Sequence, residues 1–283
     1  LPIASFAQKV GETLPAWEEG YMDIHHINTG CGECAYIILP DGTTMLIDAG
    51  ENKAGNPRHV SPKPNASRTP GEWIVDYIKT MAPVQKQKLD YALITHFHSD
   101  HMGGVLKMKN ESGRYYNTGI ITVAENLQIG MLVDRGFPDY NFLVNTEDKM
   151  IKNYFNFLHF TKRKINVEQF VPGVDNQFRL LYDSTRYAGR FKIQNIYANG
   201  WLWTGKEHEK RYLFPDFDTL EKYDIPQENT LSCAIKIVYG NFSYYTGGDV
   251  TGYPKPGRGT FHDVETWMAP VVGHTEVCCV NHH

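Results

Sequence analysis

The sequence predicts an α/β fold in which helices cover a β-sheet. Two short apolar runs, residues 35–39 and 44–47, flank the turn 40–43 and predict a β-hairpin. Residues 72–81 carry apolar side chains on one helical face and predict a helix. Residues 91–94 then form an apolar, β-favouring run that predicts a buried strand. A hairpin, a helix and a further strand in this order are typical of an α/β sandwich.

Size and composition are those of an ordinary globular protein. The 283 residues suffice for one large domain or two small ones, and the chain is 41% hydrophobic and 21% charged. The net charge of −4 and the pI near 6.3 argue against a strongly basic nucleic-acid surface. No apolar stretch approaches the length of a membrane span, so we expect a soluble chain.

Residues 1–20 are predicted to be an N-terminal extension. Within it, Ser5-Phe6-Ala7 before Gln8 resembles the small-x-small end of a secretory signal, and an ordinary N-terminus is the alternative. Under the signal interpretation the extension is a signal-peptide remnant, and the protein is periplasmic or extracellular.

The five cysteines fit no single pattern. Cys31 and Cys34 form one Cys-x-x-Cys, Cys278 and Cys279 are adjacent, and Cys233 is isolated. An odd count leaves at least one thiol without a partner in this chain. A single Cys-x-x-Cys is weak evidence for a metal site, so we interpret the cysteines as packing residues or as a disulfide.

The first half of the chain supplies one acidic residue of interest. The strand 44–47 ends in Asp48, at a place where site residues tend to emerge, although a turn-forming role before Gly50 is the alternative. His25 and His26 are adjacent in an earlier predicted strand and point to opposite faces, so we expect both to be structural.

A polar, proline-rich segment follows the strand that carries Asp48. Residues 51–71 predict a long loop, and loops of that length in a compact domain are usually functional or mobile. Arg58 and His59 are candidates for substrate contact within it, and a solvated loop is the better interpretation of both. Thr69 and Pro70 then open the predicted helix.

Three histidines and an aspartate follow the buried strand 91–94 within six residues. His96 and His98 are two apart, so an extended backbone points both imidazoles to the same side. Asp100 and His101 follow where the chain turns. Imidazole and carboxylate are ligands that zinc, iron and manganese accept, and this cluster has room for two ions. A polar turn without metal is the less consistent alternative.

The middle of the chain is harder to interpret. Residues 110–145 show no clear organisation, and a second helix is predicted from Thr146, where an N-cap residue and acidic residues precede an apolar stripe. Residues 169–174 and 191–197 predict strands. The aromatic, charged stretch 199–227 has no strong period, so we expect it to be an inserted loop that packs on the sheet.

The last segment again predicts strands that end in polar residues. Residues 231–239 and 242–246 form a hairpin pattern around a Gly-Asn turn, and Asp249 follows the second strand. The apolar run 277–280 ends in Asn281-His282-His283. A purification-tag remnant is the alternative origin of this histidine pair, but a tag is not expected behind a strand.

The segment Thr-His-Phe-His-Ser-Asp-His-Met-Gly-Gly at residues 95–104 resembles the His-x-His-x-Asp-His signature of the metallo-β-lactamase superfamily. The resemblance implies an αββα sandwich of the metallo-β-lactamase type, and it implies further strands and a helix after residue 283, so that the chain is truncated at its C-terminus. It also implies two divalent metal ions, with zinc expected and manganese or iron as alternatives.

The same resemblance implies a role for each candidate residue. His96 and His98 hold the first ion, while Asp100, His101 and His282 hold the second. Asp249 resembles the late aspartate that bridges both ions, and Asp48 resembles the early aspartate that supports the ligands by hydrogen bonds. Residues 21–283 are then one hydrolase domain, with the insertion at about 199–227.

One landmark of the superfamily is missing, because Asn199 stands where many members have an intermediate histidine ligand. His208, which lies further along the insertion, is the other candidate to replace the missing histidine ligand. The pattern resembles the extracellular nuclease-like domain of bacterial DNA-uptake (competence) proteins and their relatives, which include a secreted phosphorylcholine esterase. The matching stretches are residues 28–33, 228–232, 246–249 and 281–283. Cys31 departs from the glutamine usual in that branch, and an extra glycine precedes Asp249.

This branch implies a phosphodiesterase that uses a hydroxide held between the two ions. Its substrate would be a phosphodiester, either a nucleic acid or a phosphorylated cell-surface group. Asp100 and Asp249 would serve catalysis as ligands, and Asn229 would orient the substrate. Another hydrolase of the superfamily (a lactonase, thioesterase or β-lactamase) is the first alternative, and a non-catalytic binding protein on the same scaffold is the second. The motifs leave the oligomeric state open.

Overall fold

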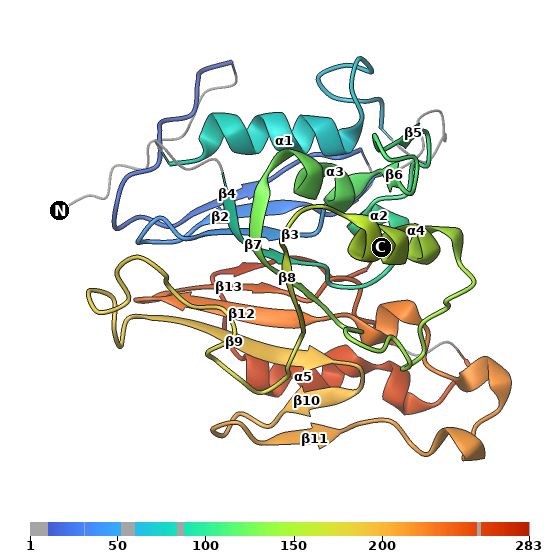
Figure 1. Ribbon diagram of the computed structural model, residues 1–283. Coiled ribbons are helices and arrows are strands. Elements are labelled where there is room, and N and C mark those ends of the chain that lie inside the picture. The colour runs from blue at the N-terminus through green and yellow to red at the C-terminus, as the bar shows by residue number, and fades with distance from the viewer. Residues whose placement is uncertain (1–10, 31, 52–59, 84–87, 254–255, 283) are drawn as a thin grey trace.

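The computed structural model describes residues 11–30, 32–51, 60–83, 88–253 and 256–282. Two six-stranded sheets lie face to face, and helices cover the outer side of each (Figure 1). The layers therefore run helix, sheet, sheet, helix, which confirms the αββα sandwich predicted from the sequence. The signal-like stretch at residues 5–8 lies outside the described residues, and so do Cys31, Arg58, His59 and His283.

The first sheet contains the strands of the N-terminal half. Its order is β1 (Asp23–His26), β2 (Ala35–Ile38), β3 (Thr44–Ile47), β4 (Lys88–Leu93), β7 (Gln128–Asp134) and β8 (Asn166–Gln169). The first three strands are antiparallel neighbours, whereas β3, β4, β7 and β8 are parallel. Parallel neighbours need crossover connections, and these contain α1 (Pro70–Met81), α3 (Gly119–Asn126) and α4 (Lys149–Phe160) on the outer face (Figure 1).

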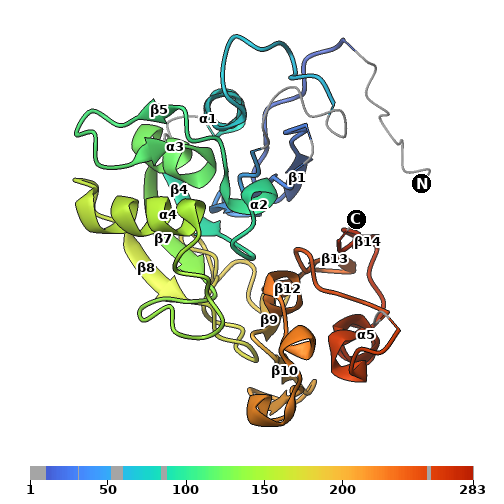
Figure 2. The same ribbon diagram turned by 90° about the vertical axis from the view of Figure 1, so that its right-hand side faces the viewer.

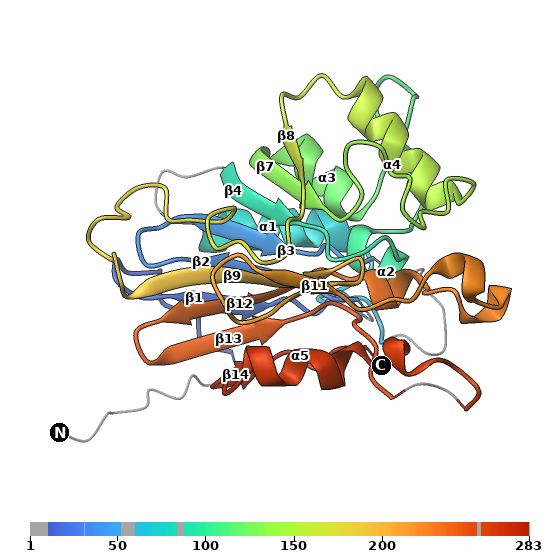
Figure 3. The same cartoon turned by 90° about the horizontal axis from the view of Figure 1, so that it is seen from below.

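The second sheet contains the strands of the C-terminal half. Its order is β11 (Lys210–Tyr212), β10 (Trp201–Trp203), β9 (Phe191–Ala198), β12 (Ala234–Tyr239), β13 (Phe242–Thr246) and β14 (Val277–Cys278). Neighbours are antiparallel except β13 and β14. α5 (Val264–Val272) covers the outer face and buries Val264 and Met268 against it (Figure 3). A small separate hairpin joins β5 (Met108–Lys109) to β6 (Tyr116–Asn117).

Strand alternation explains the three layers of core. In β2, Tyr36 and Ile38 pack against the helices, while Ala35 and Ile37 point between the sheets. All four residues are fully buried, as expected of a strand covered on both faces. Between the sheets this core is continued by apolar residues of both: Met45, Ile47, Leu93, Val133, Ile193, Ile235, Ile237 and Tyr244.

The predicted helix before β4 is confirmed, and its boundary has a clear cause. Thr69 accepts a hydrogen bond from Glu72 N, and the Glu72 carboxylate accepts one from Thr69 N, which forms a capping box around Pro70. The second predicted helix begins later than expected. Asp148, and not Thr146, is the N-cap of α4, because its carboxylate accepts from Met150 N and Ile151 N.

Three sequence-based expectations about strands need correction. The stretch 199–227 is not only a loop, since its first part forms β10 and β11 at the edge of the second sheet. The strand predicted at 169–174 is instead β8, which ends at Gln169, before Pro172 and Gly173. The strand expected over 277–280 is shorter, because β14 covers only Val277–Cys278 at the edge of the second sheet and Val280 beyond it is 86% exposed.

The described cysteines are free thiols. Cys34 and Cys233 are buried packing residues, while Cys278 is exposed and Cys279 half-buried. The disulfide alternative is therefore wrong for these four residues. Within the described part of the chain, no helix is both long and apolar enough to cross a membrane.

Candidate metal centre

The histidine cluster lies at the edge where the parallel strands of the first sheet end. β3 stops directly before Asp48, and β4 leads through Thr95 into the cluster. The carboxyl ends of parallel neighbours meet at one edge of a sheet, which brings these segments together. α2 (Ser99–Met102) then turns the chain, with Gly103 at φ 103° after its last residue. Figure 2 faces this edge, and α2 lies near its centre.

Asp48 accepts hydrogen bonds from two residues of the segment that carries the histidine cluster. Its Oδ1 accepts a hydrogen bond from Thr95 N (2.8 Å), and its Oδ2 accepts from Thr95 Oγ1 (2.7 Å). Oδ2 also lies 2.7 Å from His101 Nδ1, and because a carboxylate only accepts, this nitrogen carries the proton. His101 Nε2 therefore faces the opposite sheet, and a metal ion that binds there would displace the proton that Nε2 carries in the metal-free protein.

His96, His101 and Asp249 meet in a buried group whose donor atoms all lie within 4.8 Å of one another. Asp249 Oδ1 lies 3.0 Å from His101 Nε2, and its Oδ2 lies 3.9 Å from His96 Nε2. His98 Nδ1 lies 3.1 Å from His96 Nε2. Asp249 thus presents one oxygen to each of two histidines, across the space between the sheets.

These spacings fit a shared metal. Ligand atoms about 2.0–2.1 Å from a tetrahedral zinc lie about 3.3 Å from each other. The observed separations of 3.0 to 3.9 Å fall around that value. Imidazole nitrogens and carboxylate oxygens are also the donor types that divalent zinc, iron and manganese accept. The residues present therefore fit a divalent metal centre.

Burial and neighbouring charges shift the pKa values of His96 and His101 in opposite directions. Burial holds the pKa of His96 well below its usual range, and the positive charges of His101, His98, Arg135 and His282 lower it further. Burial also acts against protonation of His101, but the carboxylates of Asp48 and Asp249 outweigh it and raise the pKa of His101 to about 10. Without metal, His96 is therefore neutral and ready to donate a lone pair, whereas His101 holds a proton.

The other residues predicted as ligands surround this group. His98 is exposed, and Asp100 is half-buried in α2. His282 is exposed, with φ 44°, and it lies near enough for its charge to act on His96. The structure thus brings residues from both halves of the chain to one place, and their roles as ligands stay predictions.

Arg135 and Glu228 are functional candidates that the sequence analysis missed. The fully buried Arg135 guanidinium donates from Nε to Glu228 Oε1 (2.7 Å) and from Nη2 to Glu228 Oε2. Its remaining N–H groups reach Phe142 O, Leu143 O and Asn199 Oδ1, so all five donors are used. Glu228 Oε1 also accepts from Phe97 N (2.8 Å), between His96 and His98. This pair therefore fixes the backbone that carries the first two predicted ligands.

A sequence signal for Arg135 existed. Asp134 is the last residue of β7 and Arg135 follows it, at the same edge of the sheet as Asp48. A charged residue at or just after the end of a strand is the feature that predicts Asp48 and Asp249, but residues 110–145 show no clear strand pattern that would reveal it for Arg135.

The two residues considered as substitutes for the missing histidine are engaged elsewhere. Asn199 Oδ1 accepts from Arg135 Nη1 (3.2 Å), and its Nδ2 donates to Arg135 O (2.7 Å). His208 lies between β10 and β11, with Nδ1 3.2 Å from Gly173 O. Asn199 thus holds the buried arginine in place, and its amide oxygen is not directed at a metal.

Asn229 has one unexplained atom. It lies beside Glu228 in the short 3-10 helix η3 (Glu228–Leu231), and its Oδ1 is buried with no hydrogen-bond partner among the residues that the structure describes. A buried acceptor left without a donor is costly, so a ligand that supplies a donor would be favoured there. The predicted substrate contact of Asn229 stays a prediction.

Comparison with known proteins gives a family match in the same region. The family model described as the metallo-β-lactamase superfamily matches residues 28–113, a stretch that contains Asp48 and the histidine cluster. The fold is of the metallo-β-lactamase type. Divalent metal binding is general in that superfamily, and the His96, His101 and Asp249 group is present in this chain. No match was found among curated proteins.

Solved structures of this fold are similar to the chain at low sequence identity. CmlA, a diiron β-hydroxylase from Streptomyces venezuelae, is 15% identical with a TM-score of 0.43, and the match covers 94% of this chain but 35% of CmlA. A metallo-β-lactamase from Cronobacter sakazakii (12%, TM-score 0.42) is matched over 92% of this chain and 77% of its own. Yeast PDE1 (12%, TM-score 0.39) is matched over 85% and 68%. The chain thus spans about a third of the length of CmlA.

Proposed function

We propose that the protein is a metal-dependent hydrolase that cleaves phosphodiesters. The observation that carries the proposal is the position of Asp249, whose two oxygens face His101 Nε2 at 3.0 Å and His96 Nε2 at 3.9 Å. A carboxylate placed between two groups of histidines suits a pair of ions about 3.5–4 Å apart. When bound, two divalent ions lower the pKa of water and neutralise charge on phosphate oxygens.

The chain's own residues divide the work in this proposal. His96 and His98 hold one ion, Asp100, His101 and His282 hold the other, and Asp249 contacts both. Asp48 keeps His101 in the tautomer that directs Nε2 outward. Arg135 and Glu228 fix Phe97 N and so the spacing of His96 and His98. Zinc is the proposed metal, with manganese or iron as alternatives, since the donor set suits all three.

The choice of a phosphodiester rests on the motifs of the competence-protein branch. Residues 28–33, 228–232, 246–249 and 281–283 carry that resemblance. Two of these stretches supply groups near the centre, because Glu228 fixes Phe97 N and Asp249 faces both histidines. We propose a nucleic acid or a phosphorylated cell-surface group as substrate, with Asn229 Oδ1 accepting a hydrogen bond from it. The signal-like Ser5-Phe6-Ala7 supports a periplasmic or extracellular location.

The test is a comparison of substrate classes with metal-loaded protein. We expect hydrolysis of bis-p-nitrophenyl phosphate and no hydrolysis of nitrocefin. Asp249→Asn should lower phosphodiesterase activity by about 10²-fold or more, because it removes a charged ligand from both ions. His208→Gln is the matched control, since His208 contacts Gly173 O away from the cluster, and it should keep wild-type activity.

Two results would contradict the proposal. Hydrolysis of nitrocefin, a lactone or a thioester without phosphodiester cleavage would place the protein in another hydrolase class. Metal binding without hydrolysis of any of these substrates would favour a non-catalytic binding protein.

A further inference from the structure

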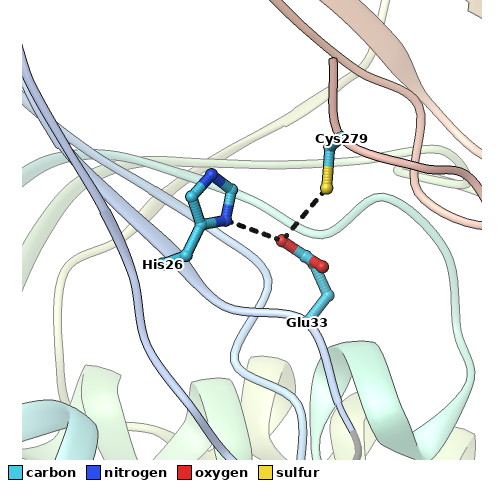
Figure 4. Close-up of side chains that lie close together, drawn as sticks. All are labelled: His26, Glu33 and Cys279. Carbon is cyan, nitrogen blue, oxygen red and sulfur yellow. Dashed lines mark hydrogen bonds and ion pairs between the residues drawn. The ribbon is translucent and has the colours of Figure 1, made fainter. Parts of the chain in front are cut away.

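A second group of metal-ligating side chains lies beside the candidate centre. His26 at the end of β1, Glu33 in the turn before β2 and Cys279 after β14 direct their donor atoms at one point (Figure 4). His26 Nδ1 lies 3.6 Å and Cys279 Sγ 3.7 Å from Glu33 Oε1. Imidazole nitrogen, carboxylate oxygen and thiolate sulfur are the three ligand types that zinc accepts.

The Cys279 thiol donates a hydrogen bond to Glu33 Oε1, whereas the His26–Glu33 pair is too long for one, and both separations suit a shared ion. A direct N–H···O hydrogen bond spans about 2.7–3.2 Å, which is shorter than the 3.6 Å between His26 and Glu33. Ligands of a tetrahedral zinc, with Zn–S about 2.3 Å and Zn–N or Zn–O about 2.0–2.2 Å, lie about 3.4–3.6 Å apart. The three donor atoms, all within 4.8 Å of one another, need only a small movement to reach that geometry.

The backbone of each residue is already fixed. His26 pairs with Ala35 in the β1–β2 ladder. Glu33 donates its N–H to Asp100 O (2.8 Å) and accepts from Gly50 N (2.9 Å). Cys279 N donates to Tyr245 O (2.9 Å). Because hydrogen bonds already hold the main chain at all three residues, metal binding would order little additional backbone. The three residues come from separate segments of the chain, so the fold and not local sequence brings them together.

Access to the group is open on one side. The side chain of His26 is 47% exposed and that of Glu33 is 27% exposed. Three protein ligands with a solvent-facing side correspond to a zinc site that keeps one position for water.

We propose that His26, Glu33 and Cys279 form an accessory zinc site that ties the C-terminal segment to the first sheet. His26 and Glu33 belong to the N-terminal half of the chain, whereas Cys279 follows β14 of the second sheet. His282 is three residues beyond Cys279, so a metal bound to Cys279 restrains the segment that carries the last predicted ligand. The site stands on its own residues and does not depend on the proposed phosphodiesterase activity.

Binding has a proton balance. Zinc binds the thiolate, so each ion that enters displaces one proton to solvent. Occupancy should therefore rise with pH.

The test uses Co²⁺ as a probe for the thiolate ligand. The candidate centre contains no cysteine, so a thiolate-to-cobalt charge-transfer band reports the accessory site alone. We expect the band in the wild-type protein and its loss in Cys279→Ser, with one cobalt ion fewer per chain by elemental analysis. Cys278→Ser is the matched control, because Cys278 is the exposed neighbour outside the group, and it should keep the band. Asp249→Asn should also keep it, whatever happens to hydrolysis.

A second measurement needs no variant. In the wild-type protein, zinc should slow alkylation of Cys279 by iodoacetamide at least about tenfold, followed by peptide mass spectrometry. Cys278 is the internal reference and should react equally fast with and without zinc. Equal alkylation of Cys279 in both conditions, or a charge-transfer band that survives Cys279→Ser, would overturn the proposal.

Discussion

At the scale of single residues, Asp48 contacts His101 in the candidate metal centre, and we predict that it supports metal binding through this contact. Replacing it by the nearly isosteric asparagine keeps the shape but removes the charge that holds the Nδ1 proton in place. We expect Asp48→Asn to weaken metal affinity about 10–100-fold, measured by competition with a chromophoric chelator. The exposed Asp139 provides the control, and Asp139→Asn should bind metal like the wild type. Equal affinity of Asp48→Asn and wild type would show that Asp48 has no supporting role.

His101 also predicts a pH dependence for the metal-free protein. Its pKa rises from 6.5 to about 10 on folding, so its protonation contributes stability that is complete below pH 6.5 and is lost as pH rises toward 10. Between about pH 7 and 9, the free energy of unfolding of the chelator-treated protein should therefore fall as pH rises. The range ends at about pH 9 because thiols, with a pKa near 8.5 or higher, also titrate above it. Thermal unfolding monitored by circular dichroism should show a falling midpoint. Asp48→Asn should show a flatter profile, and a wild-type midpoint that rises with pH would contradict the assignment.

At the scale of secondary-structure elements, the Arg135–Glu228 pair connects the end of β7 to η3 and to the segment after β4. Arg135 is fully buried, so Glu228→Gln leaves its charge without a counterion. Breaking a buried pair on one side typically costs about 3–5 kcal/mol, and urea unfolding should show a loss of that order. Glu147→Gln is the matched control, because its ion pair with Lys152 is exposed and is worth about 0–1 kcal/mol. Similar losses in both variants would refute a special role for Arg135.

The elements also show where sequence-based prediction succeeded. The strand before the histidine cluster, the capped helix α1 and the β12–β13 hairpin carry strong local signals and are confirmed. β10 and β11 were missed because each has three residues, too few to show a period of two. Their existence depends on pairing with the edge of β9, which is a tertiary contact.

The whole molecule determines what the sequence could not predict about the sites. The motif at residues 96–101 predicted the part of the candidate metal centre that lies on the first sheet, and the resemblance predicted Asp249. Nothing local linked His26 and Glu33 to Cys279, because that contact requires β14 to lie parallel to β13 and the two sheets to face each other. Arg135 and Glu228 are 93 residues apart, so their contact also depends on the tertiary fold and not on a local pattern.

Because Asp249 comes from the second sheet and His96 and His101 from the first, a bound metal should stabilise the sandwich as a whole. An ion present at about 1,000 times its dissociation constant adds about 4 kcal/mol to the free energy of unfolding. For a chain of 283 residues, chelation should then lower the unfolding midpoint by roughly 7 °C in calorimetry. The unfolding midpoint of Asp249→Asn should change much less on chelation, since this variant lacks the ligand that connects the second sheet to the metal. An unfolding midpoint of the wild-type protein that is the same with and without chelator would mean that the cluster does not bind metal and that metal does not stabilise the contact between the two sheets.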